Sequence, residues 1–491
     1  MRETGVLLHI SSLPSNYGIG TLGLEAYKFV DFLKKAQQNY WQVLPTGPTS
    51  YGDSPYQTFS AFAGNPYFID LDILKEEGLL TFDDLKELDG KHSQYVDYEW
   101  LYHTRFIVLE KAFKNFKKNA SFKKFVSENE SWLKDYALFM AIKNSMPEGN
   151  WKSWEKPYQN RFSAEVLEFE KKNKKKIEYW YFIQYEFFKQ WKKLKKYANK
   201  QGIKIIGDMP IYVAYDSSDV WADPKSWLLD EELNPYEVAG VPPDAFCETG
   251  QLWGNPLYNF ELMKKDNYSW WVKRIKESFK IFDVVRIDHF RGFESFYAIP
   301  YGDETAVNGR WVKGPGIDLF KQIKNELGDL DIIAEDLGFL TEEVNQLLKE
   351  SGFPGMKILE FAFDYDPLNN YLPTNYPTNC IAYPGTHDNM TVKEWLETQD
   401  EKQLNYIKEI LKADNNSNLV EKMISALLES PADRVVIQLQ DYLELGAEAR
   451  FNTPSTLGGN WVWRVQKDQL NDELIQKMKK LKNYGCKTIL I

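Results

Sequence analysis

Two acidic residues, Asp288 and Glu335, each follow a short apolar run, but their neighbours differ. Arg286 lies two residues before Asp288, so on a strand both side chains point to the same face. A nearby arginine lowers the pKa of a carboxyl, and an ionised, positioned aspartate can act as a nucleophile. Glu335 follows the apolar residues 332–334, where partial burial would raise its pKa and suit it to general-acid catalysis. Two carboxyls tuned in opposite directions, about 5–5.5 Å apart, are what a retaining glycosidic reaction requires.

A third acidic residue, Asp388, lies in the segment 385–389 (GTHDN) after another apolar run. Its carboxylate could stabilise positive charge on a sugar or hold sugar hydroxyls. Each of these carboxylates could instead form a structural ion pair at a strand end, and the pattern around Asp288 taken alone fits both interpretations. For Asp336, which adjoins Glu335, we favour the structural one.

Two histidines beside these carboxylates, His289 and His387, could suggest a metal site. Zinc sites usually need three or four close ligands, and the sequence contains no HxH or HExxH motif. We therefore predict no metal, and we expect both histidines to hydrogen-bond sugar hydroxyls.

Charge and composition narrow the class of partner. The 491 residues carry a formal net charge of −11, whereas nucleic acids and anionic membranes attract basic surfaces. A neutral substrate is the simpler expectation, with no nucleic acid and no membrane as partner. Three cysteines lie far apart, and no apolar run approaches the ~20 residues that a membrane span requires. The first residues lack a signal-peptide pattern, so we expect a cytoplasmic protein; the oligomeric state stays open.

The elements that must position these residues are short apolar runs ending in polar residues, as strands of a parallel barrel do. Segments with helical spacing, such as 25–36 and 341–350, fall between most of them. The alternation predicts an α/β fold, namely a (β/α)8 TIM barrel. The eight runs are 5–9 (GVLLH), 40–45 (YWQVLP), 204–209 (KIIGDM), 284–289 (VVRIDH), 331–336 (DIIAED), 357–363 (KILEFAF), 380–384 (CIAYP) and 434–439 (RVVIQL).

Uneven spacing of the runs predicts a single catalytic barrel over residues 1–491 with large, mostly helical insertions. One insertion spans 60–200, between strands two and three, and the other spans 214–280, between strands three and four. In the first, Trp180, Phe187, Trp191 and Leu194 share a helical face. The neighbouring Lys192, Lys193, Lys195 and Lys196 could form a nucleic-acid patch, but we favour the solvated face of an amphipathic helix.

Long motifs give the sequence a resemblance to a known family. RIDHFRG, AEDLG and GTHDN, in that order on successive predicted strands, resemble the catalytic segments of the amylomaltases, or disproportionating 4-α-glucanotransferases, which are relatives of the α-amylases. The resemblance extends nearly end to end. Further motifs that carry it are LLHISSLPSNYGIG, WQVLPTGPTSYGDSPYQTFSAFAGNP, GDMPIYVAYDSSDVW, GVPPDAFCETGQLWGNPLYN, GFPGMKILEFAF and NTPSTLGGNW. Two departures, Ile10 where the family would show proline and Cys247 where it would show serine, affect only local loop shape.

The resemblance implies roles for individual residues. Asp288 would be the nucleophile, Glu335 the general acid and then base, and Asp388 the transition-state stabiliser. A loop near 241–259 would cover the cleft. The residues that would bind substrate are Tyr56, Asp208, Trp253, Arg286, His289, His387 and Asn460.

The implied reaction moves a segment of α-1,4-glucan from a donor maltodextrin to the 4-hydroxyl of glucose or another maltodextrin. It proceeds with retention through a covalent glycosyl-enzyme, and it needs no cofactor because the ester keeps the energy of the glycosidic bond. Two alternatives share the sequence features: an α-1,4-glucan hydrolase, and a non-catalytic glucan-binding barrel, against which the presence of all three carboxylates argues.

Overall fold

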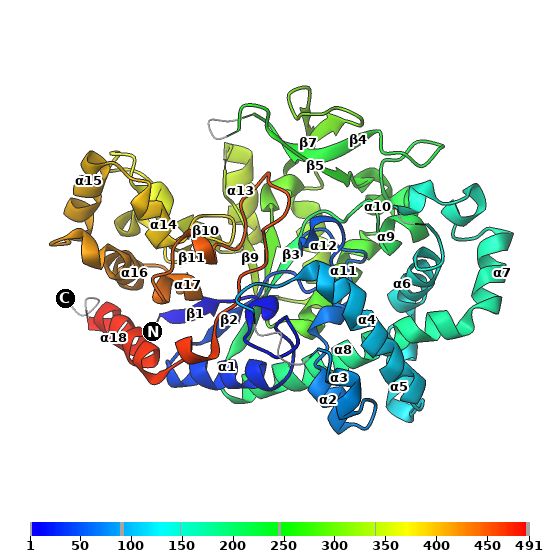
Figure 1. The fold of residues 1–491 in the computed structure, drawn as a ribbon. Helices are drawn as coiled ribbons and strands as arrows, with labels where there is room; N and C mark the ends of the chain where they lie inside the picture. The colour runs from blue at the N-terminus through cyan, green and yellow to red at the C-terminus, as the bar shows by residue number, and fades with distance from the viewer. Residues whose placement is uncertain (1, 89–92, 148, 244–246, 339, 488–491) are drawn as a thin grey trace.

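A closed sheet of parallel strands forms the centre of the computed structural model, which describes residues 2–88, 93–147, 149–243, 247–338 and 340–487. Its strand order is β10-β11-β12-β1-β2-β3-β6-β9 (Figure 1). The ends of the sheet meet because the Ala334 amide donates to the Pro354 carbonyl, 3.0 Å away. The predicted (β/α)8 barrel is confirmed, and each predicted run overlaps one strand. The strands are β1 (Glu3–Leu7), β2 (Tyr40–Gln42), β3 (Lys204–Pro210), β6 (Val284–Asp288), β9 (Ile332–Ala334), β10 (Gly355–Ile358), β11 (Cys380–Tyr383) and β12 (Arg434–Gln438).

The barrel strands are mostly apolar because the barrel interior lies on one side of them and helices lie on the other. Val6, Ile206 and Ile333, for example, are fully buried. Polar residues come at the carboxyl ends, where Asp288 ends β6 and Glu335 follows β9. Since all eight strands are parallel, these ends meet at one rim of the barrel.

Amphipathic helices cover the barrel. The predicted helices at 25–36 and 341–350 correspond to α1 and α13, and Thr341 is the N-cap residue of α13. The helices that follow barrel strands are α1 (Leu24–Lys35), α11 (Ser269–Ile281), α12 (Ile317–Leu327), α13 (Glu342–Ser351), α14 (Val392–Glu397), α15 (Glu401–Leu411), α16 (Leu419–Glu429), α17 (Leu439–Tyr442) and α18 (Asp472–Lys487).

The chain between β2 and β3 forms a helical lobe beside the barrel (Figure 1). Its longest helix, α8, buries Trp180, Phe187, Trp191 and Leu194 on one face. The helices of this lobe are α2 (Leu71–Glu76), α3 (Phe82–Leu85), α4 (Tyr98–Asn115), α5 (Ala120–Glu128), α6 (Glu130–Lys143), α7 (Ala164–Lys172) and α8 (Lys174–Lys200).

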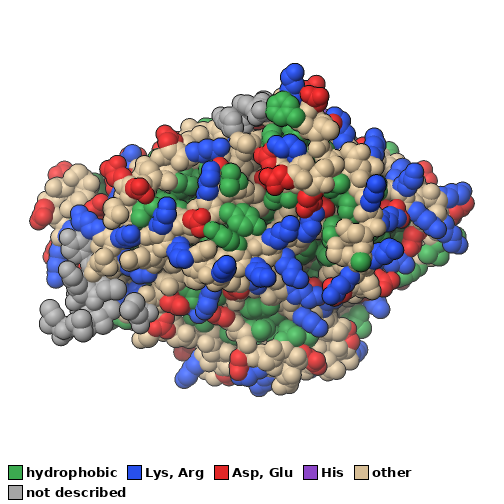
Figure 2. All heavy atoms as spheres, turned by 90° about the horizontal axis from the view of Figure 1, so that it is seen from below, with side chains coloured by type: hydrophobic (Ala, Val, Ile, Leu, Met, Phe, Trp, Pro, Cys, Tyr) green, Lys and Arg blue, Asp and Glu red, His purple; other side chains and the backbone are tan. Residues whose placement is uncertain are grey.

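The lysines near the end of α8 lie on its solvated side. Lys192, Lys193 and Lys196 are exposed, and Lys195 pairs with Asp283 at 3.3 Å. Figure 2 shows the molecule from below, where lysine and arginine side chains are spread over the face with acidic side chains among them. Within the described ranges, no helix is long and apolar enough to cross a membrane.

A second, antiparallel sheet lies over the rim of the barrel and did not figure among the sequence predictions. Its strand order is β5-β4-β7-β8, so strands from two separate insertions pair with each other. Two short helices, α9 (Ser218–Ala222) and α10 (Phe260–Lys265), flank the first pair of strands in the sequence. The strands are β4 (Glu237–Val241), β5 (Gln251–Pro256), β7 (Ser295–Pro300) and β8 (Arg310–Lys313). Residues 244–246 of the predicted loop near 241–259 lie outside the described residues.

Candidate active site

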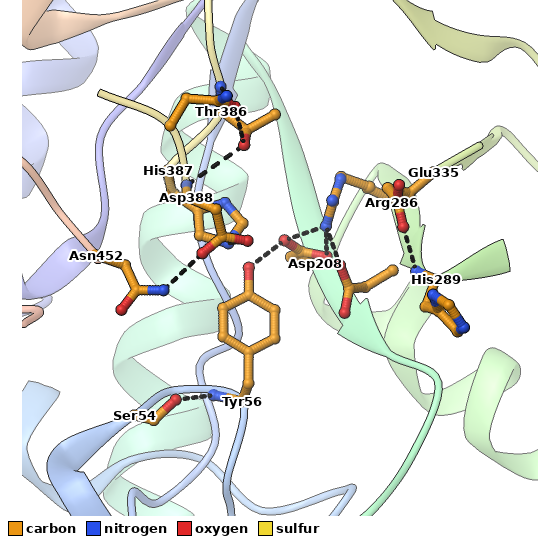
Figure 3. A network of polar contacts seen from close by, with 12 residues as sticks. Ser54, Tyr56, Asp208, Arg286, His289, Glu335, Thr386, His387, Asp388 and Asn452 are labelled. Atoms are coloured by element: carbon orange, nitrogen blue, oxygen red, sulfur yellow. Dashed lines mark hydrogen bonds and ion pairs between the residues drawn. The ribbon is translucent and has the colours of Figure 1, made fainter. Parts of the chain in front are cut away.

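Arg286 is the centre of a buried ion-pair group at the rim. It lies opposite Asp208 in the register of β3 and β6, and its Nη1 contacts both Asp208 carboxylate oxygens at 2.8 Å. The same nitrogen lies 3.0 Å from Asp288 Oδ1. Tyr56 donates its hydroxyl to Asp208 Oδ2 at 2.8 Å (Figure 3). One guanidinium therefore holds two carboxylates, and four predicted site residues form a continuous group.

The pKa of Asp288 departs from the direction predicted from the sequence. Burial raises the pKa of Asp288 to about 6, and the charge of Arg286 offsets only part of that rise. Asp208, whose side chain is fully buried, also binds Arg286 and adds a negative charge nearby. Arg286 lowers the pKa of Asp288, as expected, but the net change is upward, because the arginine is shared and desolvation of the carboxyl is larger.

Glu335 is buried, with 9% of its surface exposed. Its carboxylate accepts hydrogen bonds from the main-chain amides of His289 at 2.7 Å and Leu337 at 2.8 Å. Burial nevertheless dominates and raises the pKa of Glu335 to about 7. The predicted rise is confirmed.

Asp288 and Glu335 occupy equivalent positions on neighbouring strands. β6 and β9 are paired in register, with Ile287 opposite Ala334, and the Glu335 amide donates to the Ile287 carbonyl at 3.0 Å. The next residues along each strand are Asp288 and Glu335. Because paired strands lie about 4.8 Å apart and residues in register share a face, the two carboxyls are brought side by side at the rim.

Asp388 follows β11 and belongs to a different set of contacts. Its Oδ2 lies 3.2 Å from Nε2 of the buried His387, and its Oδ1 accepts from Asn452 Nδ2 at 2.6 Å. Burial alone would raise the pKa of Asp388, but the ion pair with His387 and the Asn452 hydrogen bond outweigh it and lower the pKa to about 2. For His387 both effects have the opposite sign. Burial lowers the pKa of His387, but the charge and the side-chain contact of Asp388 together raise it above its ordinary value.

Aromatic rings connect the two sets of residues. Tyr56 stacks on His387 with ring centroids 5.1 Å apart and an interplanar angle of 13°. Trp461 packs against both, at 5.8 Å from Tyr56 and 6.0 Å from His387. Tyr56 thus has its hydroxyl on Asp208 and its ring against His387, which places Asp388 beside the Arg286 group (Figure 3).

Trp253 and His289 form a further contact at the rim. Trp253 belongs to β5 of the second sheet, and its ring meets His289 edge-on with centroids 4.9 Å apart. His289 has a left-handed backbone, with φ of 55°, which is uncommon for a residue with a side chain. Burial lowers the pKa of His289 to about 3, so the ring is neutral. Its Nε2 makes no hydrogen bond to any residue in the described ranges.

Asn460 binds its own loop. Its Oδ1 accepts from the Thr453 amide at 2.9 Å, and its Nδ2 donates to Thr456. The side chain that reaches Asp388 is Asn452, at the start of the same motif, NTPSTLGGNW. Sequence reasoning singled out the motif but not Asn452, Arg450 or Trp461, because nothing in the spacing says which asparagine faces the rim.

Asp336 helps to close the barrel. Its Oδ1 accepts from the Met356 amide at 2.6 Å, which ties the end of β9 to β10. This agrees with the structural role favoured for Asp336. In the part of the chain that the structure describes, no three His, Cys, Asp or Glu side chains are grouped so as to hold a metal ion.

Comparison with known proteins places these residues in a family. A family model described as 4-alpha-glucanotransferase matches residues 8–470. The 4-alpha-glucanotransferase of Clostridium butyricum is 52% identical over 483 residues, covering 96% of this chain and 98% of the relative. That of Thermus thermophilus is 45% identical over 486 residues, covering 96% of each. The structure of amylomaltase from Streptococcus agalactiae in complex with acarbose has a TM-score of 0.96 at 42% identity and covers 99% of both chains.

The matched residues run from before Tyr56 to beyond Asn460, so they include every residue proposed for the site. The match also covers the whole span from β2 to β12. Identity near one half over almost the full length of both chains leaves no large segment of either unmatched. The chain therefore belongs to the 4-α-glucanotransferase family.

Proposed function

We propose that the protein transfers segments of α-1,4-glucan from a donor maltodextrin to the 4-hydroxyl of glucose or of another maltodextrin. The observation that carries this proposal is the register of β6 and β9, which gives Asp288 and Glu335 equivalent places on neighbouring strands. A separation near that of paired strands suits a retaining double displacement, in which one carboxylate attacks and the other moves the proton.

In the first step, Glu335 gives its proton to the bridging oxygen of the donor while Asp288 attacks the anomeric carbon. The glycosidic bond breaks, the reducing-end fragment leaves as an alcohol, and a glycosyl ester of Asp288 remains. Burial raises the pKa of Glu335, which favours the protonated form that a general acid requires. Arg286 lies 3.0 Å from Asp288 and favours the ionised form that a nucleophile requires.

In the second step, Glu335 takes the proton of the acceptor 4-hydroxyl, whose oxygen attacks the ester and restores the Asp288 carboxylate. Two inversions give net retention. Asp388, which the ion pair with His387 keeps ionised, stabilises the positive charge that develops on the sugar ring in both steps.

The remaining residues bind the glucan. Asp208 and Arg286 orient Asp288, while the Tyr56 ring, stacked on His387, forms a wall of the donor side. Trp253 offers a ring on the second sheet, and the neutral His289 leaves Nε2 for a sugar hydroxyl. β5, which carries Trp253, lies beside the proposed site and favours an acceptor sugar over water by limiting access.

Incubation with pure maltotriose tests the proposal. Transfer yields glucose and longer oligomers with little increase in reducing ends, whereas hydrolysis raises reducing ends steadily. Asp288→Asn should abolish both products, and the exposed Glu304→Gln serves as the matched control for loss of one acidic side chain. A steady rise in reducing ends would favour a hydrolase. Binding of maltotriose without turnover, or full activity of Asp288→Asn, would refute the proposed nucleophile.

A further inference from the structure

Asp388 is the least enclosed of the three proposed catalytic carboxylates. Its side chain is 46% exposed, compared with 27% for Asp288 and a buried Glu335. It also lies beyond the end of β11, in the segment before α14, where the sheet hydrogen bonds no longer fix the backbone. An exposed side chain on a loop loses rotamer freedom only if specific contacts hold it.

Two residues of the loop 450–461, which follows β12 and α17 in the chain, supply such contacts. Asn452 donates its side-chain amide to Asp388 Oδ1 at 2.6 Å (Figure 3). Arg450 Nη2 donates to the main-chain carbonyl of Asp388 at 3.0 Å. The carboxylate and the backbone of one residue are therefore held from the same neighbouring loop.

Arg450 also fixes the position of Asn452. Its Nε donates to the Asn452 carbonyl at 2.8 Å, so one guanidinium binds the main chains of both Asn452 and Asp388. Three donors in a planar fork can hold two carbonyls in a fixed relation, which a lysine ammonium on a flexible stem cannot reproduce.

Arg450 is itself held by a residue of α14. Arg450 Nη1 lies 3.5 Å from Glu394 Oε1, and both side chains are only 16% exposed. At the start of α14, the Val392 amide donates to the buried Asp441 at 2.8 Å. The segment that carries Asp388 is thus held by the loop after β12 on one side and by α17 on the other.

We propose that Arg450 and Asn452 form a clamp that positions Asp388 for catalysis, an inference that rests on the function proposed above. Asn452 sets the orientation of the Asp388 carboxylate. Arg450 holds the main-chain carbonyls of Asn452 and Asp388 in a fixed relative position. Neither residue touches the reacting atoms, so both are positioning residues. The clamp compensates for the exposure of Asp388 by contacts from a second loop.

Steady-state kinetics on maltotriose with the full-length protein test the clamp. Asn452→Ala should lower kcat about 10- to 100-fold, the effect of one hydrogen bond to a charged group, with KM within about twofold. Arg450→Lys keeps a positive charge beside Glu394 but cannot bind both carbonyls, so it should lower kcat while the unfolding midpoint changes little. Thr456→Ala is the matched control, because it removes hydrogen bonds within the same loop without touching Asp388.

A double-mutant cycle separates positioning from general loop stability. With a maltotriosyl fluoride donor, fluoride release follows slow variants. If Asn452 acts through Asp388, Asn452→Ala should cost nothing further in the Asp388→Asn background. An equal loss in both backgrounds, a loss in Thr456→Ala as large as in Asn452→Ala, or an unchanged kcat would overturn the clamp. Absence of transfer by the unmodified protein would overturn the proposed function and the clamp with it.

Discussion

Replacing Glu335 by glutamine should make the protein nearly inactive and should raise its stability relative to the parent as the pH rises. Burial raises the pKa of Glu335 from an ordinary 4.5 to about 7, so the fold disfavours the ionised side chain. At about 1.36 kcal/mol for each pKa unit, ionisation of Glu335 costs the folded state about 3 kcal/mol. Glutamine carries no charge, so Glu335→Gln removes this cost, which depends on pH. Its NH2 group cannot accept the second of the two main-chain hydrogen bonds that Glu335 receives, and that loss is the same at every pH.

The dependence on pH follows from linkage. Below pH 4.5, Glu335 is protonated in both the folded and unfolded states, and the variant gains nothing. As pH rises above 4.5, the unfolded state ionises first, so the gain in unfolding free energy grows to about 3 kcal/mol at pH 7 and then levels off. Transfer should fall by about 10²- to 10⁴-fold, the usual contribution of a general acid–base group.

Chemical denaturation of both proteins near pH 4, 6 and 8 measures this effect. The control is Glu304→Gln, whose exposed side chain should leave the unfolding free energy unchanged at each pH. A stability difference that does not vary with pH would refute the assignment of a raised pKa to Glu335. A stability of the variant relative to the parent that falls as the pH rises would do the same.

Three further substitutions probe the rest of the site. Arg286→Met leaves the buried Asp208 carboxylate without its cation and should lower the unfolding free energy by about 3–5 kcal/mol. Denaturant titration measures this loss. Adding Asp208→Asn to the variant should restore most of the lost stability. Tyr56→Phe removes a hydroxyl donor 2.8 Å from Asp208 and should lower kcat/KM by about 10- to 100-fold, measured on maltotriose; an unchanged kcat/KM would contradict the role of that hydrogen bond. Trp253→Ala should raise KM for maltotriose by about 2- to 10-fold with little change in the unfolding midpoint, whereas an unchanged KM would remove Trp253 from the binding surface.

The barrel could be predicted from the sequence because buried parallel strands leave a simple pattern. Each apolar run overlaps a strand, and the polar residue at its end lies at the rim. The second sheet left no such pattern. None of the four residues of β8 is buried, and β4 pairs with β7, which lies beyond an intervening barrel strand. Pairing between short strands that far apart in the sequence cannot be read from local periodicity.

Several contacts of the candidate site were predictable, but its electrostatics were not. Arg286 two residues before Asp288 was a sound reason to expect their contact, which the structure shows at 3.0 Å. The sequence could not reveal that Asp208 shares the same guanidinium, so the sign of the Asp288 pKa change was wrong. Asn452 and Asn460 belong to one motif, and only the loop conformation decides that Asn452 reaches Asp388.

The pairing of β4 with β7 has a consequence for exchanging parts between relatives. β4 and β5 come from the chain after β3, whereas only His289, the short segment η7 (Phe290–Phe293) and Glu294 separate β7 from β6. A chimera that received only β4 and β5 from a relative would pair a foreign β4 with its own β7. Because β7 begins seven positions after Asp288, any misfit would be transmitted to the catalytic rim. An exchange between relatives must therefore replace β4, β5, β6 and β7 together, as one continuous segment.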